Sequence, residues 1–542
     1  MIMNRENTIS VNIQDTKENR LSRPKVYLKS IAFNDDTQLE LEPGNIIVFT
    51  GANNSGKSQV LKDVEINLDP SDQRRGIVAK NIIFDYYGKI NDSTFLKENF
   101  IQSGNGGYQL LGVGSSFEEN TLQGYWENHT LYSGLDKLFV KRLNTEARMF
   151  SSNALNRSDL HEKHPIYKLN KSEQLVDKIS NLFHQAFGVD LVLNSNEMKT
   201  IPLHIGQAPD KKSYTMDIKD EYYSQVDRLP KLEEQGDGMR SFASILLDIF
   251  TSEYSITLID EPEAFLHPPQ ARIIGKMLAQ NNPENRQLLI STHSEDFLQG
   301  LVDADNKNVI VIRIDREKDI NRMRILESNK IKELWGNPIM RYSNILSGLF
   351  HEKVVVCESD YDCLFYQALI DAMYENRGEI SPDIFFTHCG GKSRVKDIVS
   401  ALRAVGVPVV AICDFDLLNS SSTFKPLVKA FGLDWETELA KDMKVVYDTV
   451  NSQSNVGWDI LKNIGKHGLP REALRAYENV EATCKSNGLF IVPVGEMEDF
   501  DKTLVQEKKE WVYKALEVYN LASEEKLEGA RQFVQSIIDY KL

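Results

Sequence analysis

The segment that decides the fold is IIVFTGANNSGKSQVLKDVEI, residues Ile46–Ile66. It begins with an apolar run, continues with the pattern G-x-x-x-x-G-K-[ST], and ends in a stretch with helical periodicity. This order of strand, loop and helix is the context in which a P-loop binds nucleotide phosphates. Backbone N–H groups and the helix N-terminus would surround the phosphates, while a lysine reaches the β and γ oxygens and a hydroxyl holds Mg²⁺. We therefore expect an ATP site that contains Gly51, Asn54, Ser55, Gly56, Lys57 and Ser58.

Outward from this segment, apolar runs alternate with helical patterns. The runs at 45–50, 255–259 and 287–291 are typical of buried strands in a parallel sheet covered on both faces. A second, smaller series begins with VVVCES after Lys353 and continues through the runs IFFTH and PVVAIC, with helical stretches at 362–374 and 393–405 between them. The sequence therefore predicts an α/β protein with two such units.

The boundary between the two units is expected within about 300–350. We predict a polar leader at 1–22, a first domain at 23–345 and a second domain at 346–542. The stretch at about 75–235 is too long for a loop, so it should form an inserted, partly helical region. We predict helical arms at 135–148 and 171–187. A sustained heptad series is absent from the sequence, which argues against a long coiled-coil rod.

Composition excludes several classes of protein. The 542 residues carry 63 Lys and Arg against 79 Asp and Glu, so the net charge of −16 excludes a uniformly basic nucleic-acid coat. A polyanion would need a local basic groove or bound metal ions. The sequence contains no apolar run long enough to span a bilayer, and its N-terminus is too polar for a signal segment, so we expect a cytoplasmic protein without a membrane partner. Five cysteines without a CxxC pair suggest reduced, buried thiols.

Three further motifs complete the expected nucleotide site. SITLIDEPEAFLHP is an apolar strand that ends in Asp260, a candidate Mg²⁺ ligand, and Glu261, a candidate base for the hydrolytic water. His293 closes another strand, where it would sense the γ-phosphate. Gly236 and Gly238 precede an apolar helix whose N-terminus could hold a phosphate. Taken singly, the acids could be helix caps and His293 could be structural.

The order of these motifs, Gly51–Ser58, Gln235–Ser241, Asp260–Glu263 and His293, resembles the head of ABC-type ATPases. In that family the signature loop of one subunit completes the ATP site of the other. The resemblance therefore implies an ABC-type ATPase domain that binds two ATP molecules in a homodimer or a higher homo-oligomer, with the inserted region helping to dimerise. The signature departs from that of the transporters and looks like the variant in soluble ATPases of the overcoming-lysogenisation-defect (OLD) type.

The second series of strands ends in carboxylates. KVVVCESDYDCLFYQAL resembles the opening of a Toprim domain, with Glu358 at the strand end and Asp362, rather than Asp360, at the start of the helix. PVVAICDFD supplies Asp414 and Asp416 as the D-x-D motif, and we favour Glu498 over Glu496 after LFIVPV. A lone D-x-D is more often a solvated turn. Oxygen ligands select Mg²⁺ or Mn²⁺, and two such ions could cleave a phosphodiester. The candidate metal ligands are thus Glu358, Asp362, Asp414, Asp416 and Glu498.

Basic residues near these acids could hold a DNA backbone, although an ordinary solvated helix face is equally compatible with them. They are Lys392, Arg394, Lys396 and Arg403. OLD enzymes also use a lysine late in the Toprim domain, and here the sequence leaves Lys502, Lys508 and Lys526 open.

An ABC head followed by a Toprim domain is the arrangement of the OLD family. This resemblance implies an ATP-regulated, metal-dependent DNA endonuclease with a role in antiviral defence; some members are encoded beside a reverse transcriptase in retrons and would meet its RNA or DNA product. The alternative is a non-catalytic, ATP-dependent DNA clamp or sensor with a vestigial Toprim domain. A topoisomerase or a primase would need a strand-transfer tyrosine domain or a zinc module, and neither signature is visible.

Overall fold

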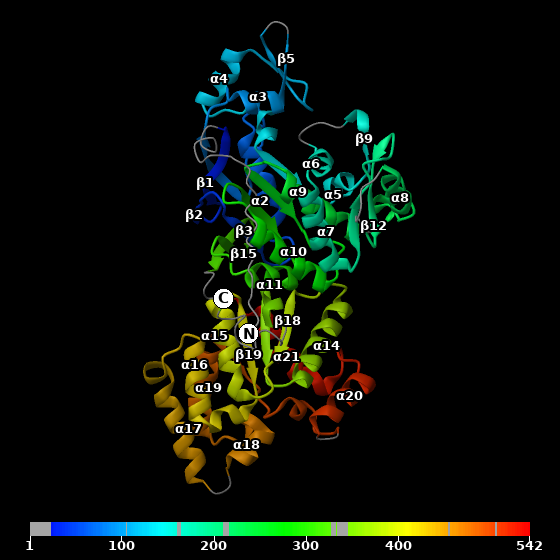
Figure 1. Cartoon of the computed structure of the whole chain (residues 1–542). Helices are drawn as coiled ribbons and strands as arrows, with labels where there is room; N and C mark the ends of the chain where they lie inside the picture. Colours follow the sequence, from blue (N-terminus) through cyan, green and yellow to red (C-terminus); the bar gives the residue numbers. More distant parts are fainter. Residues whose placement is uncertain are drawn as a thin grey trace, which may run out of the picture. The chain divides into compact units, whose positions relative to one another are not determined.

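The structure is a computed structural model that describes residues 23–103, 106–159, 164–209, 216–326, 332, 345–453, 456–504 and 507–541. The predicted leader at 1–22 lies outside these residues. The chain divides into two compact units (Figure 1), and the first holds the described residues within Met1–Phe49, Gly56–Ile312 and Arg316–Met323. The second comprises Thr50–Ser55, Arg313–Asp315 and the described residues within Arg324–Leu542. The predicted domain limits at 23–345 and 346–542 stay predictions.

A six-stranded sheet, most of whose residues belong to the first unit, carries the P-loop. Its strand order is β16-β15-β3-β14-β13-β8, and β3, β14, β13 and β8 run parallel. The three runs predicted as buried strands are confirmed as β3, β13 and β14, which are almost entirely buried. The strands span β3 Ile46–Thr50, β8 Val140–Leu143, β13 Ile256–Asp260, β14 Gln287–Ser291, β15 Val309–Glu317 and β16 Ile320–Leu326.

Smaller antiparallel sheets flank this one. The first has the order β2-β1-β4, in which the alternating apolar residues after Pro24 form β1 and β2. The others are β5-β6-β7, β10-β12 and β11-β9. Their strands are β1 Lys25–Phe33, β2 Gln38–Glu40, β4 Ala79–Tyr87, β5 Phe100–Gln102, β6 Tyr108–Leu110, β7 Ser116–Phe117, β9 Leu155–Asn156, β10 Asp190–Leu193, β11 Thr200–Ile201 and β12 Leu203–Gly206.

The helices of this part surround the sheets. One prediction is confirmed: the arm at 171–187 is α7, which begins after the N-cap Ser172 and ends at the left-handed Gly188. The helices are α2 Lys57–Leu68, α3 Ser93–Asn99, α4 Glu119–Glu127, α5 Thr145–Ser151, α6 Pro165–Lys171, α7 Glu173–Phe187, α8 Met216–Val226, α9 Asp237–Thr251, α10 Pro268–Asn281 and α11 Glu295–Asp303.

The predicted helix at 135–148 is wrong. This stretch contains the end of a 3₁₀ turn, the strand β8 and the first half of α5. Ser133 and Gly134 adopt left-handed backbone conformations, which interrupt any helix that approaches from the N-terminal side. The residues that follow pair in parallel with β13. Sheet pairing therefore overrides the helical periodicity of the local sequence, as tertiary contacts commonly do.

The second unit is built on a four-stranded parallel sheet of order β18-β17-β19-β20. The predicted runs are confirmed as β17 Lys353–Cys357, β18 Ile384–His388, β19 Val409–Cys413 and β20 Leu489–Ile491. The predicted helices are confirmed as α14 and α15. The helices are α14 Asp360–Arg377, α15 Val395–Ala404, α16 Ser421–Ala430, α17 Ala440–Ser452, α18 Trp458–Ile464, α19 Arg471–Ser486, α20 Lys508–Val518 and α21 Glu528–Asp539.

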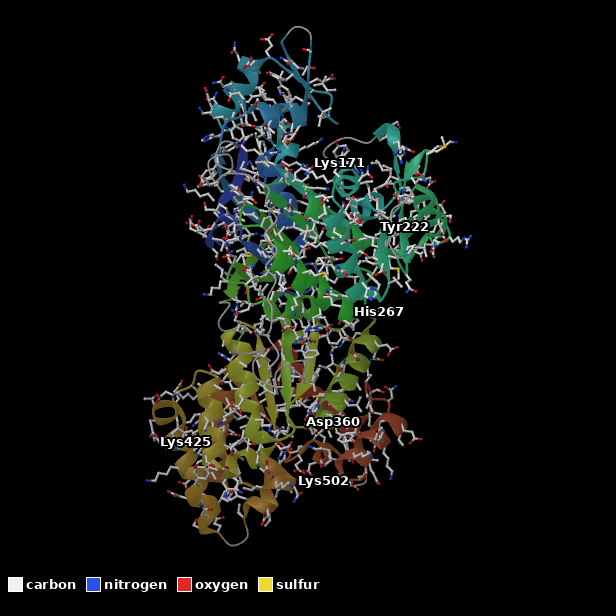
Figure 2. All side chains as sticks on the ribbon, viewed as in Figure 1. Lys171, Tyr222, His267, Asp360, Lys425 and Lys502 are labelled. Carbon is white, nitrogen blue, oxygen red and sulfur yellow. The ribbon has the colours of Figure 1, made fainter. Side chains whose placement is uncertain are left out.

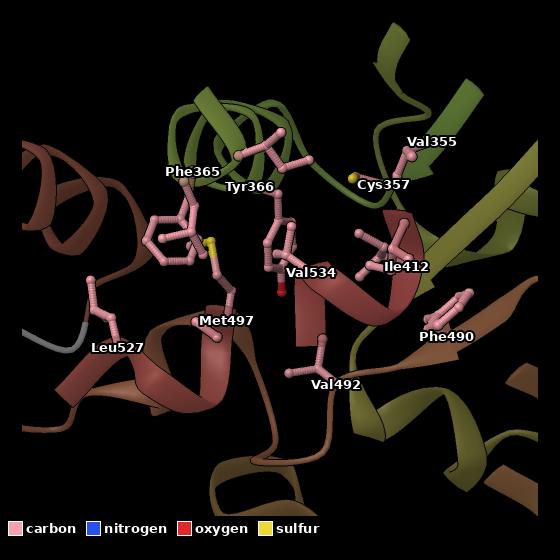
Figure 3. Packing of buried hydrophobic residues seen from close by; sticks show 14 of the residues in the cluster. Val355, Cys357, Phe365, Tyr366, Ile412, Phe490, Val492, Met497, Leu527 and Val534 are labelled. Atoms are coloured by element: carbon pink, nitrogen blue, oxygen red, sulfur yellow. The ribbon is translucent and has the colours of Figure 1, made fainter. Parts of the chain in front are cut away.

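An apolar core joins this sheet to α14, α20 and α21. Phe365 and Tyr366 of α14 pack with Met497, Val534 and the strand residue Ile412 (Figure 3). All five cysteines are free thiols, and four of them are buried, as the sequence predicted. No helix among the described residues combines the length and the apolar character that crossing a bilayer requires.

Candidate functional site

The P-loop connects β3 to α2, the position predicted for it. Gly51, Asn54 and Gly56 have φ angles of 132°, 61° and 106°, values that favour glycine or asparagine. A Cβ on Gly51 would lie 2.2 Å from the carbonyl oxygen of Ile314, so no side chain fits there. Lys57 is the first residue of α2 and is buried. The loop therefore has the backbone form that a phosphate-binding loop requires.

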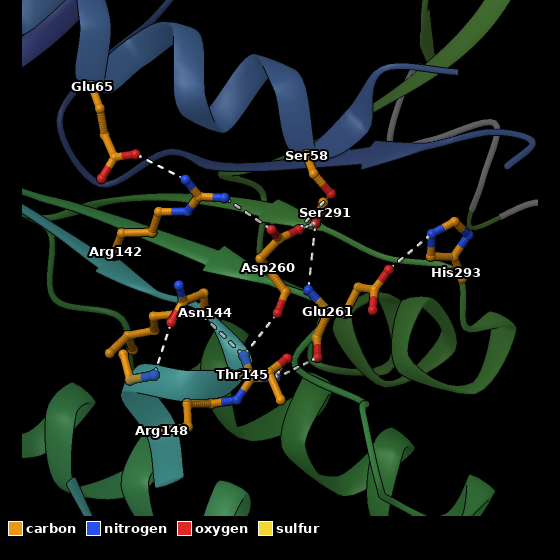
Figure 4. Close-up of polar contacts among 12 residues, drawn as sticks. Ser58, Glu65, Arg142, Asn144, Thr145, Arg148, Asp260, Glu261, Ser291 and His293 are labelled. Carbon is orange, nitrogen blue, oxygen red and sulfur yellow. Dashed lines mark hydrogen bonds and ion pairs between the residues drawn. The ribbon is translucent and has the colours of Figure 1, made fainter. Parts of the chain in front are cut away.

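Asp260 lies at the end of β13 and is held by three side chains (Figure 4). Ser58 Oγ donates to its Oδ1 at 2.7 Å, Ser291 Oγ donates to the same oxygen, and Arg142 Nη2 lies 3.1 Å from Oδ2. Burial alone would raise the pKa of Asp260, but the bonds from Ser291, Ser58 and Arg142 lower it. The structure thus brings together Ser58 and Asp260, the two predicted Mg²⁺ ligands, and keeps the carboxyl ionised.

Glu261 follows Asp260 in a left-handed conformation, with a φ of 49°. Its backbone N–H donates to Ser291 O at 3.0 Å, and its Oε1 lies 3.1 Å from His293 Nε2. Burial and the charge of Lys57 lower the pKa of His293. The two residues predicted to act on water and on the γ-phosphate are therefore in direct contact, and the imidazole is uncharged at neutral pH.

Arg148, which the sequence analysis missed, supports this backbone. Its guanidinium is fully buried and donates to the carbonyl oxygens of Asp260 at 2.7 Å and Glu261 at 3.0 Å. Glu263 acts in a similar way, because its Oε1 accepts from Thr292 Oγ1 at 2.8 Å and from the backbone N–H of His293 at 2.7 Å. The strained turn at Glu261 is thus fixed from two sides.

The expected signature loop lies at the start of α9. Gly236 is the N-cap, and a Cβ on Gly238 would lie 2.6 Å from the carbonyl oxygen of Phe265. Arg240 Nη2 donates to Met149 O at 3.0 Å, and Ser244 Oγ donates to Arg148 O, so α9 is bonded to α5. The phosphate contact expected of Gly236 and Gly238 involves a second subunit and stays a prediction.

In the second unit, the carboxyl ends of β17 and β19 bring two of the predicted acids together. Glu358 follows β17 directly, Asp414 follows β19, and the Asp414 backbone N–H donates to Glu358 Oε1 at 3.1 Å. Asp362 lies in the first turn of α14, where its Oδ2 accepts from Ser359. Lys508 Nζ lies 2.9 Å from Asp362 Oδ1 and 3.3 Å from Asp414 Oδ2. Three of the predicted acids, Glu358, Asp362 and Asp414, are therefore linked to one another by a hydrogen bond and by the ion pairs of Lys508.

The remaining candidate acids differ in their surroundings. Asp416 forms an ion pair with Lys392 at 2.7 Å. Glu498 Oε2 is buried and has no hydrogen-bond partner among the described residues, whereas Glu496 Oε1 lies 3.1 Å from Lys462 Nζ. This contrast is consistent with the preference for Glu498. Asp360, the weaker candidate in the sequence, is exposed.

Crowding of these carboxylates affects their protonation. Burial, with the nearby charges of Asp416 and Asp362, raises the pKa of Glu358 to about 7. Burial and the charge of Glu496 raise the pKa of Glu498 to about 7, and burial raises that of Asp414 despite Lys508. Such a group gains from a bound cation, because the cation offsets the repulsion between carboxylates.

The donor atoms suit a cation that prefers oxygen, such as Mg²⁺ or Mn²⁺. They are carboxylate oxygens, one of which, Glu498 Oε2, is buried without a partner. The geometry is not assembled for a metal, since the described residues contain no group of three His, Cys, Asp or Glu side chains close enough to hold one. Instead, the ammonium group of Lys508 lies between Asp362 and Asp414.

The structure separates the three late lysines that the sequence left open. Lys508 contacts the acids, whereas Lys502 pairs with Asp499 at 3.6 Å and Lys526 with Asp501 at 3.9 Å. The four basic residues predicted to lie near the acids have different surroundings. Lys392 reaches Asp416, Arg394 is exposed, Lys396 is half-buried, and Arg403 packs over the ring of Phe431.

Comparisons with known proteins bear on both units. Residues 46–298 match the family described as "AAA domain, putative AbiEii toxin, Type IV TA system". Residues 349–416 match the family described as "Overcoming lysogenization defect protein-like, TOPRIM domain". This second range contains Glu358, Asp362, Asp414 and Asp416, whereas Glu498 and Lys508 lie beyond it.

Two characterised nucleases are similar to part of the chain. The Old nuclease of Escherichia phage P2 is 26% identical over 265 residues, which cover 45% of this chain and 43% of the relative. The OLD nuclease of Thermus scotoductus is 26% identical over 242 residues, which cover 42% of this chain and 43% of the relative. The chain thus aligns with less than half the length of each relative.

Solved structures of SMC head domains match part of the chain. An Smc head bound to the C-winged helix domain of ScpA matches with a TM-score of 0.35 and 14% identity, and covers 56% of this chain and 99% of its own. The SMC head domain from Thermotoga maritima matches with a TM-score of 0.30 and 11% identity over the same shares. The chain thus combines a match to an AAA ATPase domain family at 46–298 with a match to an OLD-like Toprim domain at 349–416.

Proposed function

We propose that this protein is an ATP-regulated, divalent-metal-dependent DNA endonuclease. The observation that carries the proposal is the carboxylate group of Glu358, Asp362 and Asp414 at the strand ends of an OLD-like Toprim domain. The similarity to the two OLD nucleases supports the same reaction class. The P-loop and its surrounding residues supply the regulation.

In the nuclease site, Glu358, Asp362, Asp414, Asp416 and Glu498 are the residues proposed to hold Mg²⁺ or Mn²⁺. Such ions would stabilise the attacking and leaving oxygens of the phosphodiester. Lys508 pairs with Asp362 and Asp414, and its ammonium group would also supply a contact to a DNA phosphate. Lys392, which is held by Asp416, stands next to this group and is the nearest candidate for a further backbone contact.

In the ATPase site, Lys57 binds the β and γ phosphates, and Ser58 with Asp260 holds Mg²⁺. Glu261 orients and activates the water, and His293 senses the γ-phosphate from its contact with Glu261. Gly236 and Gly238 complete the site of a second subunit in a homodimer or a higher homo-oligomer. The inserted region at about 75–235 is proposed to contribute to that dimer.

ATP binding, more than ATP turnover, is proposed to set the state of the nuclease. The biological role that we propose is antiviral defence, by analogy with OLD proteins. A reverse transcriptase with its RNA or DNA product is a proposed partner on the same analogy. The alternative function, a non-catalytic DNA clamp, is not favoured, because a vestigial site has no reason to keep a buried, unpartnered carboxylate oxygen such as Glu498 Oε2.

The test is a nicking assay on supercoiled plasmid with Mg²⁺ or Mn²⁺, each with and without ATP. We expect open-circular or linear product that requires the metal and whose rate changes with ATP. A chelator should stop the reaction, and added metal should restore it. Metal-independent DNA binding without any nicking would instead establish the clamp and refute the endonuclease.

A further inference from the structure

A cavity lies in the first unit, apart from the P-loop and the Asp260 group. Its volume is about 700 Å³, within the range of roughly 300–1,000 Å³ typical of sites for small ligands. Its lining comes from elements distant in the sequence, among them the start of β1, α3, the turn after β6, the strand β8, the first turn of α6 and the end of α9. No residue of the proposed ATP or nuclease sites lines it.

The lining of this cavity is rich in cationic side chains. Five cations line the cavity, Arg23, Lys25, Lys137, Lys141 and Lys168, against two carboxylates, Glu98 and Glu253. Lys141 is also paired with Asp248, which lies outside the lining, so the excess is two positive charges, in a chain whose net charge is −16. The two acids cannot balance the set, since Arg23 already pairs with both and Lys168 shares Glu253 at 2.8 Å.

Lys25 shows this imbalance most clearly. It forms no ion pair among the described residues, and its Nζ donates instead to the backbone oxygen of Glu253 at 2.7 Å. Burial and the charge of Arg23 lower the pKa of Lys25 to about 8. A half-buried ammonium group with cationic neighbours and no carboxylate partner is stabilised when an anion binds beside it.

The cavity lining also contains apolar and aromatic side chains. Phe95, Leu110 and Phe139 are buried there, with Leu138 and Val113 beside them. Tyr254 also lines the cavity, with Lys141 Nζ 5.5 Å from the centre of its ring. A flat ring can pack against such side chains while charged groups at the other end hold a phosphate.

We propose that this cavity is a binding site for a nucleoside phosphate, distinct from the ATP of the P-loop. The phosphate lies against Lys25 and Lys168, and the base packs between Tyr254 and the side chains of Phe95 and Phe139. This proposal goes beyond the proposed nuclease function and depends only on the residues that line the cavity. Neither sheet-end carboxylates nor the P-loop contribute to it.

The test measures binding of AMP, GMP, CMP and dTMP by titration calorimetry to the full chain that carries Lys57→Ala, which removes the main phosphate contact of the P-loop. We expect one mononucleotide to bind with a stoichiometry of one. Substituting Lys25→Gln and Lys168→Gln together should weaken binding by at least roughly tenfold, since each lysine supplies a charge-assisted hydrogen bond. Arginine at both positions should restore it.

The matched control is Lys171→Gln, because Lys171 is exposed at the end of the same helix as Lys168 and does not line the cavity (Figure 2). This variant should bind like its parent, and inorganic phosphate or adenosine alone should bind at least roughly tenfold more weakly, since phosphate meets only the charged part of the lining and adenosine only the apolar part. The proposal is overturned if no mononucleotide binds at millimolar concentration, if phosphate binds as tightly, or if the double glutamine variant keeps full affinity. Tighter binding of a short 5′-phosphorylated oligonucleotide would also overturn it, because the ligand would then be a DNA end.

Discussion

Replacing Lys508 by Met tests whether the Toprim carboxylates form a cation site. The change removes an ammonium group that contacts Asp362 Oδ1 at 2.9 Å and Asp414 Oδ2 at 3.3 Å, and both acid side chains are at most 10% exposed. Breaking a buried pair costs about 3–5 kcal/mol. Because the Lys508 side chain is 23% exposed, we take the lower end, about 3 kcal/mol. For a unit of this size the melting temperature should fall by roughly 6–12 °C.

The metal dependence of this loss makes the test specific. In the presence of a chelator, the variant should unfold at the lower temperature, as measured by calorimetry. Saturating Mg²⁺ should stabilise the variant more than the wild type, since the ion meets carboxylates that no longer have Lys508 as a partner. A variant that melts with the wild type, or that gains no more than the wild type from Mg²⁺, refutes the idea that these acids share one cation.

Lys502→Met is the control for this experiment. Like Lys508, Lys502 follows the last strand of the sheet and contacts a carboxylate, that of Asp499 at 3.6 Å. Its side chain, however, is 44% exposed. Exposed ion pairs contribute about 0–1 kcal/mol. We therefore expect a small change in melting temperature and no change in the response to Mg²⁺.

Four further substitutions and one control, Asp360→Ala, test the two sites. Asp414→Ala should abolish plasmid nicking and leave ATP binding intact, whereas Asp360→Ala, at an exposed neighbour of the site (Figure 2), should nick like the wild type. Glu261→Gln should bind ATP yet hydrolyse it roughly 10²–10⁴-fold more slowly, and wild-type turnover would remove this residue from the role of base. Lys57→Ala should weaken ATP binding in an equilibrium titration; unchanged affinity contradicts the P-loop assignment. Arg148→Lys should lower kcat for ATP hydrolysis by roughly 10–100-fold with little change in KM, because it loosens the backbone of Glu261. A rise in KM as large as the fall in kcat would instead indicate a general folding defect.

The sequence predicted well those parts of the sites that lie within single strand-to-loop units. The P-loop, the acids after β13 and the acids after β17 and β19 each follow an apolar run directly, so local order placed them. Parallel pairing of the strands then brings the carboxyl ends together, which is why Asp414 reaches Glu358 across 56 residues of sequence. Such a prediction needs only the strands and their direction.

The choice among the late lysines could not be made in this way. Lys502, Lys508 and Lys526 all follow the last strand, and no local pattern distinguishes them. Lys508 reaches Asp414 because it begins α20, which packs against α14. Helix packing of this kind depends on side chains far apart in sequence, such as Trp511 and Phe365, whose ring centres lie 5.0 Å apart.

The strand β8 contributes one side chain to the ATPase site and another to the cavity, and the sequence analysis predicted a helix in its place. Its four residues read as part of a helix, yet they complete the edge of the main sheet beside β13. Successive residues of a strand point to opposite faces, so Lys141 lines the cavity while Arg142 contacts Asp260. A helix would have separated these two side chains by only about 100° of rotation around its axis. One strand in the inserted region thus gives a side chain to each place, and a ligand that binds beside Lys141 lies a single residue from the group that holds Asp260.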